Sequence, residues 1–352
     1  MLFRSSSFAD VDVPRRQWVV EGFIPDRTVT ILGGDGGTGK SLLALQLAAA
    51  VATGNSWLDL KTTRGAAIFL SAEDEADEIH RRLYHICRHQ DFQLSSLRDL
   101  HIIPLAGKEA LLSKPDRSSG GVQPTALWAQ LSQTIASIRP KLLILDTLAD
   151  IYSGNEIDRA QVRAFIGLLR GLALQFDLAV LVLAHPSLSG MSSGSGSSGS
   201  TGWSNSVRSR LYFERSKDDV ESNDGRLLST KKANYAAIGA EMRLRWQAGV
   251  FQIDDGTVDR ERAVAIKAGQ AKVDDVFLEL LHQFCSQGQA LSSKPSTTFA
   301  PAIFEKHSAA SGIRSKAFAA SMERLLAAGQ IHVMRSGPPS KPRFELRPGP
   351  PP

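Results

Sequence analysis

The chain has 352 residues, of which 42% are hydrophobic and 22% charged, so it is neither a disordered protein nor a fibre. This length suits about two domains. Its two cysteines, Cys87 and Cys285, exclude a disulfide scaffold and a zinc site built from cysteines. The formal net charge is +5, and residues 258–352 carry 13 Lys and Arg against 8 Asp and Glu, so the whole excess lies there. A basic end of this kind suits either nucleic-acid contact or an ordinary solvated surface.

The localisation follows from what the sequence lacks. No apolar run approaches the roughly 20 residues that span a bilayer. The first residues, Met1–Ser5, are too polar for a signal peptide. We therefore expect a cytoplasmic protein that has no membrane partner.

The first two thirds of the chain alternate apolar strands with helices. Residues 1–27 are predicted to form an N-terminal arm, and 28–32 a buried strand closed by two glycines. Further apolar strands are expected at 66–70, 142–145 and 179–184, and helices at 40–53, about 76–89, 125–138 and 159–176. Residues 107–124 resemble a loop. Uniformly apolar strands that alternate with helices indicate a mostly parallel sheet covered on both faces, an α/β fold.

The rest of the chain changes character twice. After a Ser/Gly-rich segment at 189–200, we expect short antiparallel strands at 211–214, 227–230, 242–246 and 249–251, which extend the sheet at one edge. Asn223-Asp224-Gly225 favours a hairpin turn. Helices at 272–286 and 315–328 and a hairpin over 330–346 then suggest a small helical domain at 265–347, for which a winged helix is one candidate. The core domain is accordingly placed at 28–257.

The clearest motif lies between the first strand and the first helix. Its residues are Gly34, Asp35, Gly36, Gly37, Thr38, Gly39, Lys40 and Ser41, followed by Leu42. They fit G-x-x-x-x-G-K-[ST], a P-loop. Glycines let backbone N–H groups surround phosphates, and the helix directs its positive end at the same anion. Lys40 would bind the β- and γ-phosphates of ATP, and Ser41 would ligate Mg²⁺.

Three polar residues follow the predicted strands at the edge where ligands bind in such sheets. Asp146 ends the third strand and is predicted to hold Mg²⁺ together with Ser41. Glu73 follows the second strand, and we predict that it orients the attacking water; Asp74 is the next candidate for this role. His185 ends the fourth strand and is a candidate sensor of the γ-phosphate.

These motifs together resemble the RecA/DnaB-like ATPases. More narrowly, they resemble the RepA-type hexameric replicative helicases of plasmids and the AAA family ATPases (AAA_25) of phages and mobile elements. The likeness covers about residues 15–250. The segments that carry it are Gly34–Gln46, Ser71–Asp74, Ile79–Leu83, Leu143–Leu148, His185 and Lys232–Tyr235. The resemblance implies a RecA-like core, a homohexameric ring with ATP between subunits, and single-stranded DNA in its centre.

The resemblance also implies residues that act between subunits. An arginine of the neighbouring subunit reaches the γ-phosphate in that family. The RepA pattern has an arginine near the position of Thr201, which this chain lacks, so Arg208 or Arg210 is the candidate here. Lys232 is expected near the neighbour's nucleotide. Arg82 is a candidate for stacking on the adenine.

One observation weakens the helicase interpretation. The segments expected to face a central pore, 150–156 and 187–202, contain no lysine or arginine, although loops that track DNA need cations or exposed aromatics. Two alternatives therefore remain. One is a regulatory ATPase that switches a partner protein. The other is a DNA-binding replication or partition factor whose C-terminal domain reads duplex DNA.

Overall fold

The computed structural model describes residues 4–9, 11–116, 118, 120–185, 201–217, 223–236, 239–336 and 343–350. The chain divides into two compact units, Met1–Asp254 and Asp255–Pro352. Residues 18–25, which the sequence analysis assigned to a separate arm, lie within the first unit. There β1 (Trp18–Val20) and β2 (Ile24–Pro25) pair in antiparallel fashion, and Val19, Val20 and Ile24 are buried.

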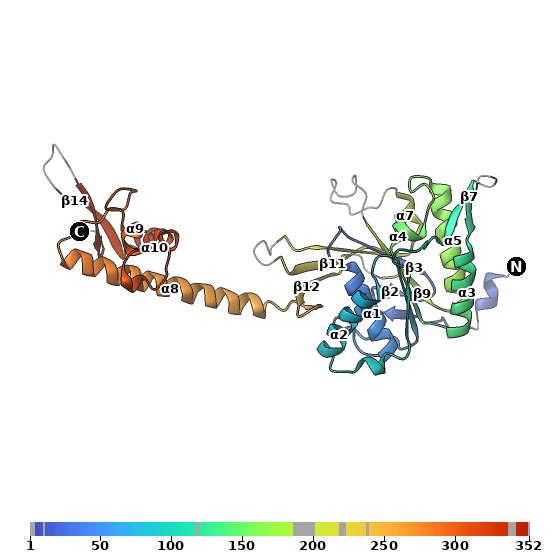
Figure 1. Ribbon diagram of the computed structural model, residues 1–352. Helices are drawn as coiled ribbons and strands as arrows, with labels where there is room; N and C mark the ends of the chain where they lie inside the picture. Colours follow the sequence, from blue (N-terminus) through green and yellow to red (C-terminus); the bar gives the residue numbers. More distant parts are fainter. Residues whose placement is uncertain are drawn as a thin grey trace. The chain divides into compact units, whose positions relative to one another are not determined.

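A nine-stranded sheet forms the centre of the first unit, in the order β13-β12-β11-β10-β3-β9-β8-β4-β5 (Figure 1). Six neighbouring strands are parallel: β3 (Val29–Gly33), β4 (Ala67–Ser71), β5 (Leu100–Pro104), β8 (Leu142–Asp146), β9 (Ala179–Ala184) and β10 (Ser209–Arg215). Every residue of β3, β4, β8 and β9 is buried, as their uninterrupted apolar sequences predict.

Helices cover both faces of this sheet (Figure 1). On one face, α1 (Lys40–Thr53) and α2 (Ala76–His89) pack through residues such as Leu43 and Ile86. On the other, α3 (Ala126–Ile138), α5 (Arg159–Phe176) and the short α4 (Leu148–Ile151) and α7 (Thr201–Ser206) enclose a second apolar cluster that includes Phe165 and Trp203. The mostly parallel α/β core predicted from the sequence is confirmed.

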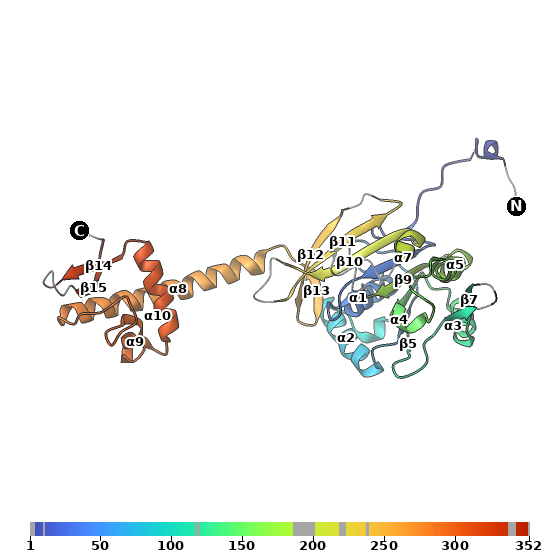
Figure 2. The same cartoon turned by 90° about the horizontal axis from the view of Figure 1, so that it is seen from above.

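The far edge of the sheet corrects one expectation (Figure 2). β11 (Gly225–Ala233), β12 (Glu241–Gln247) and β13 (Val250–Ile253) are antiparallel extensions as predicted, but β10 is parallel to β3. Its polar ends made it resemble an edge strand, yet Leu211, Tyr212 and Phe213 are buried between two neighbours. Asn223 adopts a φ of 58° before β11, and the β10–β11 connection includes residues outside the described part.

Two further elements were missed by the sequence patterns. β5 was not predicted because His101 and Pro104 interrupt its apolar run, and its residues are only half-buried. The segment 107–124, expected to be a loop, contains a hairpin of β6 (Ser113–Asp116) and β7 (Gly121–Pro124). Its prolines and charges hide the strand pattern.

The second unit has its own core. It contains α8 (Thr257–Ser286), α9 (Ala300–Phe304), α10 (Ser315–Ala327) and a hairpin of β14 (Ile331–Ser336) and β15 (Arg343–Pro348). The rings of Phe277, Phe304 and Phe318 meet in its centre. α8 begins well before residue 272, where the apolar periodicity starts. Among the described residues, no helix is long and apolar enough to cross a membrane.

Candidate functional site

The P-loop lies between the carboxyl end of β3 and the first turn of α1, as the motif requires. It is held by its own side chains. The Lys40 ammonium group donates to the carbonyl oxygens of Gly34, at 2.7 Å, and Asp35, at 2.9 Å. The Thr38 hydroxyl also donates to the Asp35 carbonyl, at 2.9 Å. Gly39 caps the start of α1 with a φ of 96°, a conformation that favours glycine.

Residues from the added strands support this loop from outside. The Tyr212 hydroxyl on β10 donates to the Asp35 carboxylate at 3.1 Å. The buried Arg226 on β11 donates through Nε to the Thr38 carbonyl at 2.9 Å. The Phe251 ring on β13 closes over Gly39. Sequence analysis missed these three residues, since no motif marks them and only the strand order brings them to the loop.

Lys40 is buried, and burial lowers the pKa of its ammonium group. The carboxylates of Asp146, Glu73 and Asp35 act against this shift. The site therefore holds one buried cation with three carboxylates near it. Phosphate oxygens placed beside Lys40 would stabilise its charged form further.

Asp146 supports the predicted metal site. Its carboxyl group is fully buried, and neither oxygen has a hydrogen-bond partner among the described residues. Burial raises its pKa to about 7, while the nearby Ser41 hydroxyl acts in the opposite direction. An unpartnered buried carboxylate beside a hydroxyl is what a Mg²⁺ site requires. No cluster of three or more metal-binding side chains occurs in the described residues, so water and phosphate oxygens would complete the coordination.

Glu73, His185 and Lys40 lie together although they are distant in sequence. His185 Nε2 is 3.5 Å from Glu73 Oε1, and His185 Nδ1 is 3.3 Å from Lys40 Nζ. The strand order explains this arrangement, because β8 separates β4 from β9 and all three end at the same edge. The histidine thus bridges the predicted water-orienting carboxylate and the phosphate-binding lysine.

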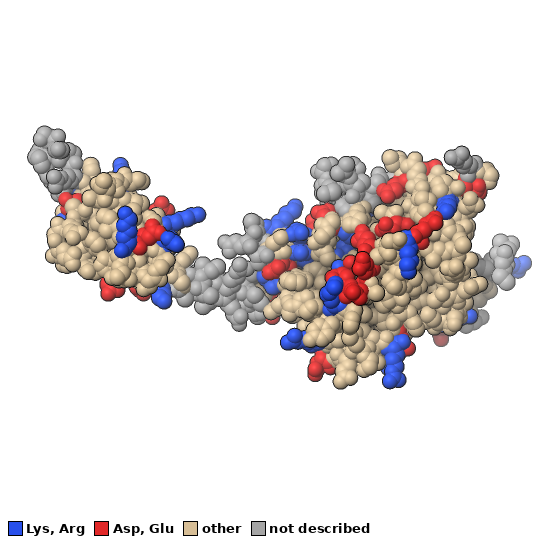
Figure 3. Space-filling model, viewed as in Figure 1, with Lys and Arg blue, Asp and Glu red and all other residues tan. Residues whose placement is uncertain are grey.

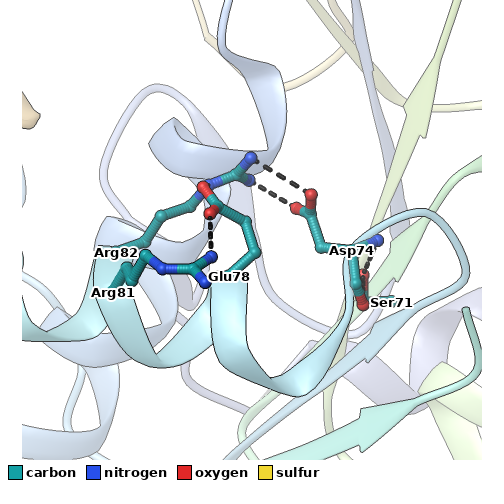
Figure 4. A network of polar contacts seen from close by, with 5 residues as sticks. All are labelled: Ser71, Asp74, Glu78, Arg81 and Arg82. Carbon is teal, nitrogen blue, oxygen red and sulfur yellow. Dashed lines mark hydrogen bonds and ion pairs between the residues drawn. The ribbon is translucent and has the colours of Figure 1, made fainter.

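Asp74 and Arg82 are engaged with each other (Figure 4). The Arg82 guanidinium group contacts both oxygens of Asp74 and also pairs with Glu78, at 3.0 Å. Burial raises the pKa of Asp74, and Arg82 opposes the shift. Because its carboxylate already binds an arginine, Asp74 is less suited than Glu73 to orient water. The stacking of Arg82 on adenine stays a prediction.

A cavity of about 540 Å³ connects these groups. Its lining includes the predicted site residues Lys40, Ser41, Leu42, Glu73, Arg82 and His185. It also includes side chains to which the sequence analysis gave no role in the site, namely His85, Asp224, Arg226, Trp246 and Phe251. Its volume suits a small-molecule ligand such as a nucleotide.

The residues predicted to act between subunits lie away from this cavity. Arg208 and Arg210 stand at the amino end of β10, whereas the P-loop follows the carboxyl end of the adjacent parallel β3. Lys232 on β11 lies opposite Arg210 on the neighbouring strand β10. Its ammonium group donates to the Ser204 carbonyl at 2.6 Å. Burial lowers the pKa of Lys232, and the nearby Arg208, Arg210 and Arg170 lower it further. Any contact of these cations with a nucleotide therefore requires a second copy of the chain.

The fold and the site together define a P-loop ATPase with a RecA-like α/β core. The chain belongs to the AAA_25 family of AAA domains, which matches residues 3–191. Among solved structures, it is similar to a KaiC-like protein of the hyperthermophilic archaeon Pyrococcus horikoshii OT3. That likeness has 14% sequence identity and a TM-score of 0.47, and it covers 68% of this chain and 98% of that one.

Proposed function

We propose that this ATPase is a ring-forming motor driven by single-stranded DNA, a helicase of the RepA type acting in plasmid or phage DNA replication. In the proposed reaction, Glu73 orients a water molecule for in-line attack on the γ-phosphate. Lys40 and the P-loop amides hold the phosphates, and Ser41 and Asp146 would hold Mg²⁺. When bound there, Mg²⁺ would supply charge neutralisation to the phosphates. ADP and phosphate are the products.

The contact between His185 and Glu73 is the observation that supports this proposal best. The chain runs from His185 directly into the Ser/Gly-rich segment expected to face the pore, which lies outside the described residues. A ligand that displaces this segment would move His185 and change the position of Glu73, which is 3.5 Å away. Hydrolysis would then depend on DNA through the side chain of His185.

The ring itself is part of the proposal. Arg208, Arg210 and Lys232 lie too far round the sheet to serve the nucleotide of their own chain, but a neighbouring chain could present its cavity to them. We propose a homohexamer in which Arg208, or Arg210 in its place, stabilises the charge that develops on the γ-phosphate. Loss of hydrolysis in Arg208→Ala would then be rescued in mixtures with Glu73→Gln, because each variant supplies what the other lacks.

The test is ATP hydrolysis by the full chain with and without single-stranded DNA. Glu73→Gln should lower the DNA-stimulated rate about 100-fold or more while nucleotide binding persists. Glu75→Gln is the matched control, since Glu75 is exposed and its side chain makes no cap hydrogen bond. Hydrolysis that ignores DNA would contradict the motor and leave the ATPase intact.

The second unit supports a different candidate function. Its helices α9 and α10 are followed by the β14–β15 hairpin, an order that suits a winged helix reading duplex DNA. In this alternative, the ATPase is a switch or an assembly clamp, and the nucleotide state controls DNA or partner binding. Duplex binding that differs between ATP and ADP, without strand separation, would favour it.

A further inference from the structure

Helix α5 carries an unusual charge. Its 18 residues include Arg159, Arg163 and Arg170 and no acidic side chain. Arg159 and Arg163 are exposed, and Arg163 has no ion pair with any described residue. Figure 3 shows acidic side chains gathered in the middle of the visible face of the first unit, with basic side chains around them. Within α5, no carboxylate offsets the charge of the three arginines.

A pocket of about 310 Å³ lies between this helix and the segment 205–208. It is lined by Arg163 and Arg170 from α5, by Arg208, and by Asn205 and Ser206, with no carboxylate among the described lining residues. The Arg170 guanidinium group donates to the Ser206 carbonyl at 2.6 Å, which fixes it beside Arg208. Lys232 is held near them through the Ser204 carbonyl. These cations repel one another, and an anion bound in the pocket would offset that repulsion.

Two glycines lie one turn apart on the same side of α5. Gly167 lines the pocket, and Gly171 follows one turn later; both are exposed. Glycine within a helix costs about 1 kcal/mol relative to alanine, yet a Cβ at either position would meet no neighbouring atom of the described residues within 4 Å. Nothing in the described part of the chain requires these glycines. They leave the helix backbone open to close approach by a ligand.

The shape of the cluster favours a chain of anions over a single one. Arg163 and Arg170 are separated by seven residues of helix, which corresponds to about 10 Å at 1.5 Å per residue. Helix α5 follows one segment expected to face the pore, 150–156, and Arg208 follows the other, 187–202, beyond the short α7. Both segments lack lysine and arginine, and α7 lacks them too. The cations nearest to these segments along the chain are those of α5 and Arg208.

We propose that the Arg163–Gly171 face of α5 binds the phosphate backbone of single-stranded DNA. This inference rests on the proposed DNA-driven function and names the surface that would carry it. Contacts to phosphate are electrostatic and do not involve the bases. Binding through this face should therefore be independent of the DNA sequence and should weaken steeply as the salt concentration rises.

The experiment is the binding of fluorescein-labelled oligo(dT) to the full chain across a series of salt concentrations, followed by anisotropy. For single strands, each phosphate contact contributes about 0.7 to the slope of log K against log salt. Arg163→Gln should therefore reduce the slope by about 0.7 and weaken binding several-fold at low salt. Arg163→Lys should restore both, since a phosphate contact needs only the positive charge. Arg88→Gln, at an exposed arginine on α2, is the matched control and should bind as the wild type does.

The outcomes separate the two proposals. If oligo(dT) binds and Arg163→Gln binds equally well, the surface is wrong and the DNA-driven function stands. If the wild type neither binds oligo(dT) nor hydrolyses ATP faster in its presence, the function fails and this surface fails with it. Hydrolysis that needs two copies of the chain depends on protein concentration. If Arg163→Gln weakens that dependence but leaves oligo(dT) binding unchanged, the DNA surface is wrong and the pocket instead binds the nucleotide phosphates of a second copy.

Discussion

Gly34 faces the carbonyl oxygen of Phe213 so closely that a Cβ at position 34 would lie 2.2 Å from it. The oxygen belongs to the backbone of β10, which is fixed by pairing with β3 and β11, so it cannot move aside. The first glycine of the P-loop is therefore required by the neighbouring strand as well as by the phosphates.

Gly34→Ala should destabilise the first unit by about 3 kcal/mol or more, because overpacking against fixed backbone is costly. Gly36→Ala tests the interpretation within the same loop. A Cβ at Gly36 would meet nothing within 4 Å, and its φ is not positive. Urea unfolding should separate the two variants clearly; equal stabilities would show that the close approach to Phe213 does not matter.

Lys40→Ala should abolish ATP hydrolysis while the fold persists. Among the described residues, Lys40 makes hydrogen bonds only to the P-loop carbonyls and His185, and removing its charge also removes a buried cation. We expect a far-UV circular dichroism spectrum like that of the wild type and a hydrolysis rate at background. Full activity in this variant would remove the basis for the ATPase assignment.

Asp146 should make the metal-free protein sensitive to pH. Its folded-state pKa of about 7 lies above the usual value of 3.8, so the folded chain binds the proton more tightly than the unfolded chain. Stability should therefore fall as the pH rises from about 4 to 7 and stay low above that. Thermal melts in EDTA across this range provide the measurement.

Asp146→Asn gives the complementary result. Replacing the carboxylate with a neutral group of the same shape should raise Tm at pH 8 in EDTA and flatten its dependence on pH. The same change should remove stabilisation by Mg²⁺ in the presence of nucleotide and abolish hydrolysis. If the variant melts below the wild type at pH 8, burial of this charge is not what limits stability.

The sequence predicted the centre of this molecule better than its edges. Uniformly apolar strands such as β4 and β8 are buried on both faces, so composition alone identifies them, and the P-loop is specified by local spacing. The part of the nucleotide cavity that the antiparallel strands line was not predictable in this way. Trp246 and Phe251 reach the cavity only because β11, β12 and β13 continue the sheet beyond β10. No sequence motif marks Arg226. Its hydrogen bond to the Thr38 carbonyl arises because β11 lies beside β10 in the sheet.

Gly167→Ala should stabilise the first unit by about 1 kcal/mol, since alanine is the better helix former and no atom of the described residues obstructs its Cβ. For a unit of this size, the expected rise in Tm is about 2–4 °C. Differential scanning calorimetry tests the gain, and a lower stability would reveal a constraint on α5 that the folded chain does not show. If DNA lies against this face, the stabilised variant should also bind oligo(dT) less tightly.

The support that β10 to β13 give the P-loop bears on where this chain can be divided. The AAA family match ends at residue 191, but the nucleotide cavity is completed by residues as far along as Phe251. A fragment ending at 191 would lack β10, so β3 would become an edge strand and its five buried residues would lose that neighbour. Exposed edge strands of this kind promote aggregation. We therefore expect the segment that matches the family to be too short to fold around ATP by itself. A truncation or fusion that preserves activity should keep its junction beyond Ile253, the last residue of β13.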